Sequence, residues 1–279
     1  MQVRVIDFTS KTAPADFAAG LKEIGFAVIS NHPISQSLVD RAYSVWGDFF
    51  KSTEKHDFAF DRKTHDGYVS SELSETAKGY NVKDIKEFYH YYAGRRCPAS
   101  CRDVTVALSN ALTTMAGTLL KWIEDSAPEM VRKDFSMPLC DMIKESELTL
   151  FRMIHYPPLS GHEPEGAVRA ASHEDINLIT LLPAATAEGL QVKDANGNWL
   201  DVPINPGWII VNVGDMLQEC SGHYYPSTSH RVLNPTGEAA KQSRLSMPLF
   251  LHPRDEVVLS KRHTAGSYRI ERYKELGLL

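Results

Sequence analysis

Three residues of this 279-residue chain have the types and spacing of metal ligands: His173 and Asp175 in ASHEDINLITLLP, and His230 in STSHRVLNP. Two imidazoles and one carboxylate cover one face of an octahedral ion and leave the opposite face open, which suits non-haem ferrous iron that activates dioxygen. A catalytic zinc site with three protein ligands is the nearest alternative. Zinc hydrolysis also needs a base beside the metal, and Glu174 lies between two ligands, so on a strand it points the other way.

The third ligand has two candidates in the same part of the chain. Both His223 and His230 lie far enough beyond Asp175 for several strands to intervene, so the fold must bring either one back to the metal. We choose His230 because of the string SHRV around it, and His223 stays as the alternative. Most of the eleven histidines are expected to be ordinary surface or core residues.

The segment Arg244-Leu245-Ser246 could bind a carboxylate. On a strand, Arg244 and Ser246 face one side, and the leucines and methionine at alternate positions face the other. A guanidinium and a hydroxyl inside a barrel cost free energy unless something satisfies them, and a carboxylate does so with three hydrogen bonds. An exposed arginine on an edge strand is the alternative. Tyr156, in FRMIHYPP, could add a hydroxyl to the same ligand or be an aromatic core residue.

Composition excludes several classes of protein. The 35 acidic and 30 basic residues give a formal net charge of -5 without a basic block, which argues against nucleic acid and anionic membranes as partners. No apolar run approaches the roughly 20 residues that span a bilayer, and the first residues do not read as a signal peptide. Four cysteines are too few and too scattered for a disulfide scaffold. These features predict a soluble cytoplasmic protein with reduced thiols.

The first part of the chain predicts strands and helices in turn. Residues 3–8 and 26–30 are apolar and β-branched, as in strands. Pro14 opens a helical pattern that stops near Gly25, Ser35 can cap a longer helix, and apolar residues from about 103 to 125 have the period of a third helix. Residues 55–100 are polar, aromatic and irregular, and no element is assigned to them.

After about residue 145 the pattern changes to short strands separated by turns. Strands are predicted at 147–155, at WIIVNV (208–213) and at 244–251. The runs 190–192 and 199–202 flank Asn196-Gly197, which is a strong signal for a β-hairpin. Many short strands with turns between them favour a sandwich or barrel over a doubly wound sheet.

Taken together, these strings resemble the isopenicillin N synthase-like family of iron- and 2-oxoglutarate-dependent oxygenases over nearly the whole chain. EIGFAVISNHPIS in the front half is similar to the N-terminal region of that family. IHYPP, HEDINLITLLP, SHRVLNP and RLSMPLFLHP are similar to its catalytic half and occur in the family order. Each string alone is common, but the combination is specific.

The resemblance implies a mainly β fold with flanking helices, a distorted double-stranded β-helix of the jelly-roll or cupin-like kind. It divides the chain into an N-terminal α/β region (1–100), a helical segment (101–144), a jelly-roll catalytic core (145–256) and a C-terminal extension (257–279). We expect these four parts to form one structural unit, because no linker separates them.

The resemblance also assigns functions to six residues. Three correspond to the ligands of ferrous iron: His173, Asp175 and His230. Two correspond to the residues that hold the distal carboxylate of 2-oxoglutarate, Arg244 and Ser246, with Tyr156 assisting. The implied reaction consumes dioxygen, releases succinate and CO2, and hydroxylates, desaturates or cyclises a small organic molecule.

The sequence departs from the family at three places near these residues. Ile154 stands where many members have asparagine, His155 stands where tyrosine is frequent, and Asn31-His32-Pro33 replaces the usual NHG. The first two affect the role of Tyr156 and not the metal site. The presence of Asp175 argues against relatives that halogenate, because these replace the carboxylate with a small residue.

Two other functions and the substrate stay open at this point. An iron oxidase of the same fold can use the arginine and serine to hold its substrate and needs no 2-oxoglutarate, and a metal-binding protein without turnover is the second alternative. Four residues are candidates to line the substrate pocket: Phe88, Tyr89, His90 and Arg169. For the aromatic stretch 87–92, ordinary packing is the competing interpretation.

Overall fold

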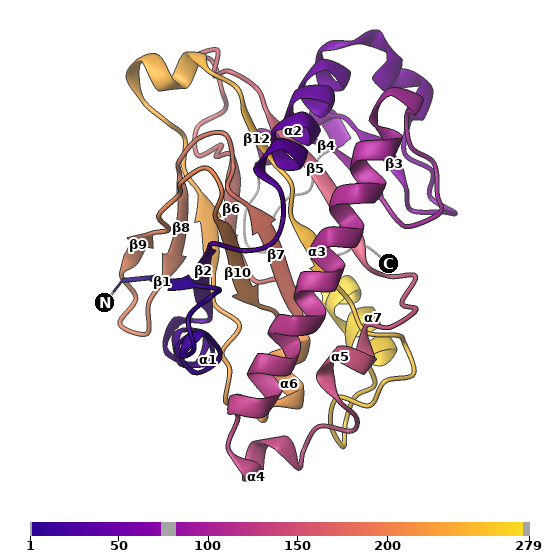
Figure 1. Cartoon of the computed structure of the whole chain (residues 1–279). Coiled ribbons are helices and arrows are strands. Elements are labelled where there is room, and N and C mark those ends of the chain that lie inside the picture. Colours follow the sequence, from indigo (N-terminus) through magenta and orange to yellow (C-terminus); the bar gives the residue numbers. More distant parts are fainter. Residues whose placement is uncertain (1, 74–81, 276–279) are drawn as a thin grey trace.

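The computed structural model describes residues 2–73 and 82–275, which form two β-sheets and a layer of helices (Figure 1). The larger sheet has nine strands, eight of which follow one another in space: β1 (Arg4–Asp7), β2 (Phe26–Ser30), β10 (Ile209–Val213), β7 (Ile179–Pro183), β13 (Leu249–Leu251), β5 (Leu150–Tyr156), β4 (Glu87–Tyr91) and β3 (Gly67–Val69). The ninth strand, β12 (Arg244–Ser246), also pairs with β5. The smaller sheet contains β6 (Ala170–His173), β11 (His230–Val232), β8 (Leu190–Lys193) and β9 (Trp199–Asp201), in that order.

The longer helices pack on the outer face of the larger sheet, and the longest of them crosses that face (Figure 1). The α-helices are α1 (Ala13–Ile24), α2 (Gln36–Lys51), α3 (Ala99–Ser126), α4 (Glu129–Arg132), α5 (Leu139–Met142), α6 (Asp215–Cys220) and α7 (Ala265–Glu275). Three short 3-10 helices complete the set: η1 (Thr53–Phe58), η2 (Ser71–Leu73) and η3 (Gly237–Lys241). α3 forms where apolar side chains recur every three or four residues, and this stripe is buried against the sheet.

Two separate cores result, one on each face of the larger sheet. The outer core joins the helices to the sheet, with the fully buried Trp46 among its largest side chains. The inner core lies between the two sheets. β2 shows the division, because Ala27 and Ile29 belong to the outer core while Phe26 and Val28 belong to the inner one.

This architecture confirms the predicted β-rich fold with flanking helices, since two packed, largely antiparallel sheets are the arrangement of a jelly roll. The strand predicted at 26–30 is β2, residue for residue, and the helix predicted to stop near Gly25 ends there with a left-handed φ of 71°. The turn at Asn196-Gly197 joins β8 to β9, and Gly197 has the positive φ that such a turn requires.

Three features differ from the sequence-based expectation. Residues 55–100 contain β3 and β4, and all five residues of β4 are buried, so its sequence has no alternation to reveal a strand. The strand predicted at 244–251 is divided into β12 and β13 at Pro248, which has no N–H and whose carbonyl accepts a hydrogen bond from Arg152 N. α6 follows Gly214, in a part of the chain where no helix was predicted.

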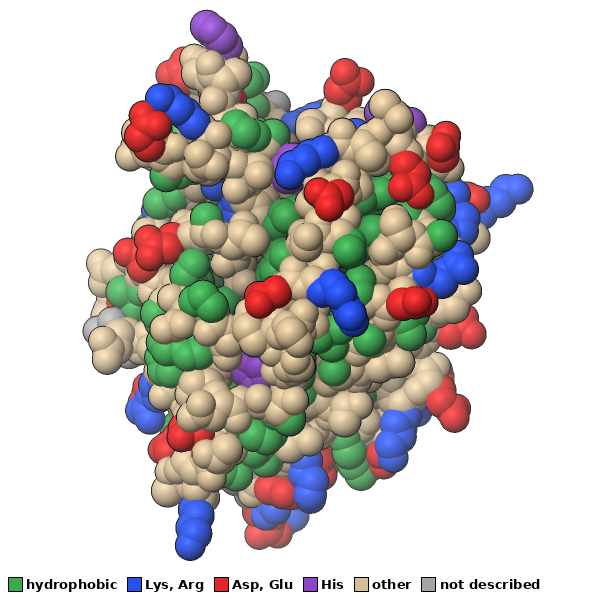
Figure 2. All heavy atoms as spheres, turned by 45° about the horizontal axis from the view of Figure 1, so that its top comes forward, with side chains coloured by type: hydrophobic (Ala, Val, Ile, Leu, Met, Phe, Trp, Pro, Cys, Tyr) green, Lys and Arg blue, Asp and Glu red, His purple; other side chains and the backbone are tan. Residues whose placement is uncertain are grey.

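The larger sheet mixes strands from the first 100 residues with strands from residues 145–256, because β2 pairs with β10 and β4 pairs with β5. No helix in the ranges 2–73 and 82–275 combines the length and the hydropathy that crossing a bilayer requires. On the face shown in Figure 2, acidic and basic side chains are interspersed.

Candidate metal and co-substrate site

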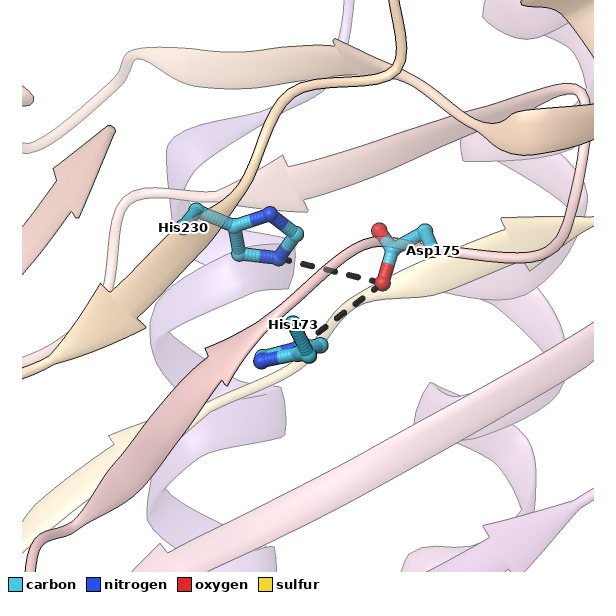
Figure 3. Close-up of side chains that lie close together, drawn as sticks. All are labelled: His173, Asp175 and His230. Atoms are coloured by element: carbon cyan, nitrogen blue, oxygen red, sulfur yellow. Dashed lines mark ion pairs between the residues drawn. The ribbon is translucent and has the colours of Figure 1, made fainter. Parts of the chain in front are cut away.

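His173, Asp175 and His230 lie together where β6 ends and β11 begins (Figure 3). The two strands are antiparallel neighbours, and His173 is the register partner of His230. The Nε2 atoms of His173 and His230 lie 3.9 and 3.8 Å from Oδ1 of Asp175. All three candidate ligand atoms are within 4.8 Å of one another, so the fold brings the predicted ligands into one cluster.

Hydrogen bonds to the backbone fix the orientation of both imidazoles. Nδ1 of His173 lies 2.8 Å from the carbonyl oxygen of Ala171, and Nδ1 of His230 lies 3.1 Å from that of Thr228. A carbonyl oxygen can only accept, so each Nδ1 carries the proton and donates it. The lone pairs are therefore on the Nε2 atoms, which point at Asp175 and are ready to bind a metal.

Two donors hold the Asp175 carboxylate, which is only 7% exposed. Its Oδ2 accepts hydrogen bonds from Thr180 Oγ1 at 2.6 Å and from Asn212 Nδ2 at 2.8 Å. Asn177 Nδ2 in turn donates to Thr180 Oγ1 at 2.9 Å. Oδ1 makes no hydrogen bond within the described residues, so this oxygen is left for a metal ion.

Sequence reasoning missed Thr180 and Asn212, although a signal was present. Each is a single polar residue within a buried apolar strand, ITLLP in β7 and IIVNV in β10. Register pairing places the two opposite each other. A polar side chain at such a position needs a partner, and here the partner is Asp175, a candidate metal ligand.

The electrostatics of the cluster favour the protonation states that bind a metal. Burial alone would raise the pKa of Asp175, but the two imidazoles and the two hydrogen bonds outweigh it and hold this pKa below its usual value. The His173 side chain is 41% exposed, but the surrounding protein atoms desolvate its imidazole and disfavour the charged form. This desolvation, together with the nearby His230, lowers the pKa of His173 to about 4. The carboxylate is thus charged and the His173 imidazole neutral near pH 7.

The donor set fits ferrous iron better than hydrolytic zinc. This is the one group of three or more His, Cys, Asp or Glu side chains in the described chain that could hold a metal. Glu174 is exposed and accepts a hydrogen bond from Ser229 Oγ, so it offers no base beside the histidines. His223 is exposed in the turn after α6, with a φ of 65°, and is not part of the cluster.

Arg244 is buried on the inner face of the larger sheet, with 1% of its surface exposed. Its Nε donates to the carbonyl oxygen of Ala187 at 2.9 Å, while its buried Nη1 has no hydrogen-bond partner in the described residues. The guanidinium lies 5.1 Å from the ring centroid of Tyr156, its register partner on β5. A buried guanidinium with a free N–H is a ready site for a carboxylate.

The other residues around Arg244 follow the alternation of a strand. Ser246 is buried opposite Ile154, and the apolar residues at alternate positions join the outer core, as predicted. Ile154 and Tyr156 belong to the inner core. His155 lies on the outer face, where its Nδ1 is 2.7 Å from Glu87 Oε1 and its ring stacks on Phe50. The His155 departure from the family therefore does not face the site.

The four candidate substrate residues are not all on the same side of the sheet. Phe88 belongs to the inner core, and His90 stacks on it with ring centroids 4.9 Å apart. Arg169 is also buried, with its guanidinium 5.9 Å from the ring centroid of Tyr156. Tyr89 lies on the outer face, where it packs against Trp46 and donates a hydrogen bond to the carbonyl of Arg96. The structure does not bring Tyr89 to the site.

Comparison with known proteins agrees with this geometry. Residues 148–253 match the model of the 2OG-Fe(II) oxygenase superfamily, and residues 3–103 match that of the N-terminal region of non-haem dioxygenases in morphine synthesis. An oxygenase structure from Shewanella oneidensis is 50% identical, covers 100% of both chains and has a TM-score of 0.91. Proline hydroxylase buaE of Petromyces alliaceus is 30% identical over 86% of this chain and 81% of its own length. Jasmonate-induced oxygenase 3 of Arabidopsis thaliana is 28% identical over 92% of this chain and 69% of its own.

Replacing His230 with alanine should remove tight iron binding and all turnover, because it deletes one of three ligands. Replacing the exposed His223 in the same way should change neither. Anaerobic titration with ferrous iron measures the binding of both variants. A His230→Ala protein that keeps iron, together with a His223→Ala protein that loses it, would show that the third ligand is wrongly assigned.

Thr180→Val should weaken iron binding by about ten- to a hundredfold, the usual effect of losing a group that orients a ligand. The valine keeps the shape of the side chain but leaves Asn212 as the one side-chain donor to Asp175 Oδ2 within the described residues. Thr113→Val is the matched control, since the Thr113 hydroxyl donates only to a carbonyl of α3. Equal iron affinity in the two variants would contradict the role given to Thr180.

Proposed function

The chain belongs to the 2-oxoglutarate/Fe(II) oxygenase superfamily, and from this premise we propose that it hydroxylates a small organic molecule at an iron held by His173, Asp175 and His230. Its cofactor is ferrous iron, and its co-substrates are 2-oxoglutarate and dioxygen. The observation that supports the proposal best is that Arg244, which lies in the same barrel as the His-Asp-His cluster, is buried and its Nη1 has no hydrogen-bond partner in the described residues. A metal site alone would not need such a group.

Bound iron supplies the activation of dioxygen and, together with 2-oxoglutarate, the oxidising power for an unactivated C–H bond. The residues of the chain would bind the iron and the co-substrate and orient them. The Nε2 atoms of the two histidines and Oδ1 of Asp175 would hold the iron, and Thr180 and Asn212 keep the carboxylate in place. A ferrous ion held by three such ligands would keep positions open for small molecules.

We assign Arg244, Ser246 and Tyr156 to 2-oxoglutarate. The free N–H of Arg244 can form charge-assisted hydrogen bonds to the distal carboxylate, and Ser246 is the next residue along the same face of β12. Tyr156 lies opposite Arg244 and can donate its hydroxyl. The inner face of β4 offers Phe88 and His90 to the substrate, together with Arg169, whereas Tyr89 is left out of the proposal.

Two properties of the whole chain belong to the same proposal. The regions 1–100, 101–144, 145–256 and 257–279 act as one structural unit, which the pairing of β2 with β10 supports. The protein works in the cytoplasm, and the four cysteines support this, because all of them are free thiols and three of them are buried.

The decisive experiment for the function follows succinate and oxygen in the iron-loaded protein while small carboxylic acids, amino acids and phenolics are added. We expect succinate release that needs both iron and 2-oxoglutarate and that rises with a fitting substrate, and none with Asp175→Ala. Oxygen uptake without succinate would identify the oxidase of the same fold. A protein that binds iron but takes up no oxygen with any compound would be the non-catalytic alternative.

Arg244→Lys should raise the Michaelis constant for 2-oxoglutarate by about tenfold or more, because lysine keeps the charge but loses the planar fork. Tyr156→Phe should weaken the binding of 2-oxoglutarate by only about two- to tenfold, since a neutral hydrogen bond contributes about 0.5–1.5 kcal/mol. Anaerobic titration of the metal-to-ligand charge-transfer band measures both affinities. A Tyr156→Phe protein as impaired as Arg244→Ala would reverse this ranking.

A further inference from the structure

Most of the buried charged side chains in residues 2–73 and 82–275 have a partner within the protein. Asp66 pairs with Arg96, and Glu87 accepts hydrogen bonds from Lys55 and other donors on the outer face. Asp194 accepts hydrogen bonds from backbone N–H groups of the turn between β8 and β9. Besides Asp194, three buried charges in these ranges have no partner of opposite charge at ion-pair distance, apart from the histidines of the candidate metal site: Asp175, Arg169 and Arg244.

One further ion pair lies beside the metal site and is already balanced. Lys86 Nζ is 2.8 Å from Asp84 Oδ2, and both side chains are buried. Asp84 Oδ1 also accepts a hydrogen bond from the backbone N–H of Ala171, two residues before His173. This pair therefore supports β6 and adds no net charge to the interior.

Arg169 has the features of a second anion-binding site. It is 1% exposed, its Nη2 donates to the carbonyl oxygen of Gln242 at 2.9 Å, and its Nε has no hydrogen-bond partner in the described chain. Its guanidinium and that of Arg244 both lie within 6 Å of the Tyr156 ring centroid, at 5.9 and 5.1 Å. Both guanidinium groups are positively charged and lie near the same aromatic ring, so they repel each other. Burial lowers the pKa of Arg169, and the charge of Arg244 lowers it further.

When the site holds ferrous iron and 2-oxoglutarate, the formal charges balance except for the positive charge of Arg169. The two positive charges of ferrous iron and the one of Arg244 are offset by Asp175 and by the two carboxylates of 2-oxoglutarate. One positive charge then stays uncompensated in the interior, which is unfavourable unless an anion enters. We infer that the primary substrate is a small organic acid with one negative charge, whose carboxylate pairs with Arg169. This inference rests on the function proposed above.

The same charge count excludes other classes of substrate. A phosphate ester carries between one and two negative charges near pH 7 and would leave an excess of negative charge. An amino acid brings its own ammonium group, which would need a further partner inside the barrel. Arg169 precedes His173 by four residues, so about 13 Å of extended strand at most separates their Cα atoms, and the acid must be small enough to lie between guanidinium and metal.

The test compares molecules that share a skeleton and differ in charge, with the protein held anaerobically with ferrous iron and saturating 2-oxoglutarate. The probes are 3-phenylpropanoate, its amide and phenylalanine, together with propanoate, propanamide and alanine for a smaller pocket. Shifts of the charge-transfer band and of the melting temperature measure binding without turnover. We expect at least one acid to bind ten times or more tightly than its amide and its amino acid. If neither acid is preferred, the inference is wrong.

Substitutions at Arg169 then locate the preference. Arg169→Gln should abolish the preference for the acid and leave the affinity for 2-oxoglutarate within about twofold, and Arg169→Lys should keep part of the preference. Arg231→Gln is the matched control, because Arg231 follows the ligand His230 but stacks on Trp199 and binds Gln191, outside the inner core. If Arg169→Gln loses 2-oxoglutarate as Arg244→Ala does, the residue belongs to the co-substrate and the inference fails. Absence of the charge-transfer band in the unaltered protein would instead refute the proposed function.

Discussion

The site depends on the pairing of β6 with β11. This register makes His173 and His230 direct neighbours across two strands that are far apart in sequence. The register then shifts, so that Val232 faces Ala170 and β6 contains one residue more than a regular ladder allows. Such an irregularity changes which side chains of a strand face inward, and here His173 lies among the ligands while Ala170 joins the inner core. One local shift thus sets both the metal cluster and the packing behind it.

The front half of the chain contributes to the same site through packing. Phe26 of β2 packs its ring against that of His230, with centroids 5.3 Å apart and an interplanar angle of 67°. Phe26 belongs to the inner core because β2 pairs with β10, the strand that carries Asn212. The orientation of a candidate metal ligand therefore depends on a strand that contains no candidate ligand. Strands from both halves of the chain therefore contribute to the packing around the site.

The fold and the His-Asp-His cluster could be predicted from the sequence because both leave local signals, whereas contacts across sheets do not. The HxD pair, the Asn196-Gly197 turn and the period of α3 can each be recognised from neighbouring residues. β4 could not be recognised, since it is covered on both faces and its five residues show no alternation. The roles of Thr180 and Asn212 depend on a register between β7 and β10 that no local pattern reveals. Tyr89 was placed with its neighbours by adjacency alone, and the alternation of the strand puts it on the other face.

That same alternation separates two polar systems on adjacent residues of β5. His155 faces outward and joins Glu87, which also accepts hydrogen bonds from Lys55 and Tyr68 beneath α2 and η1. Ile154 and Tyr156 face inward, toward Arg244 and Ser246. A substitution of His155 removes a hydrogen-bond donor from the buried Glu87 carboxylate, so it should lower the stability of the outer core. A change at Ile154 alters the wall of the ligand site, so its cost falls on binding. The two departures from the family lie next to each other in sequence and act on different parts of the protein, because one strand separates the helical layer from the barrel.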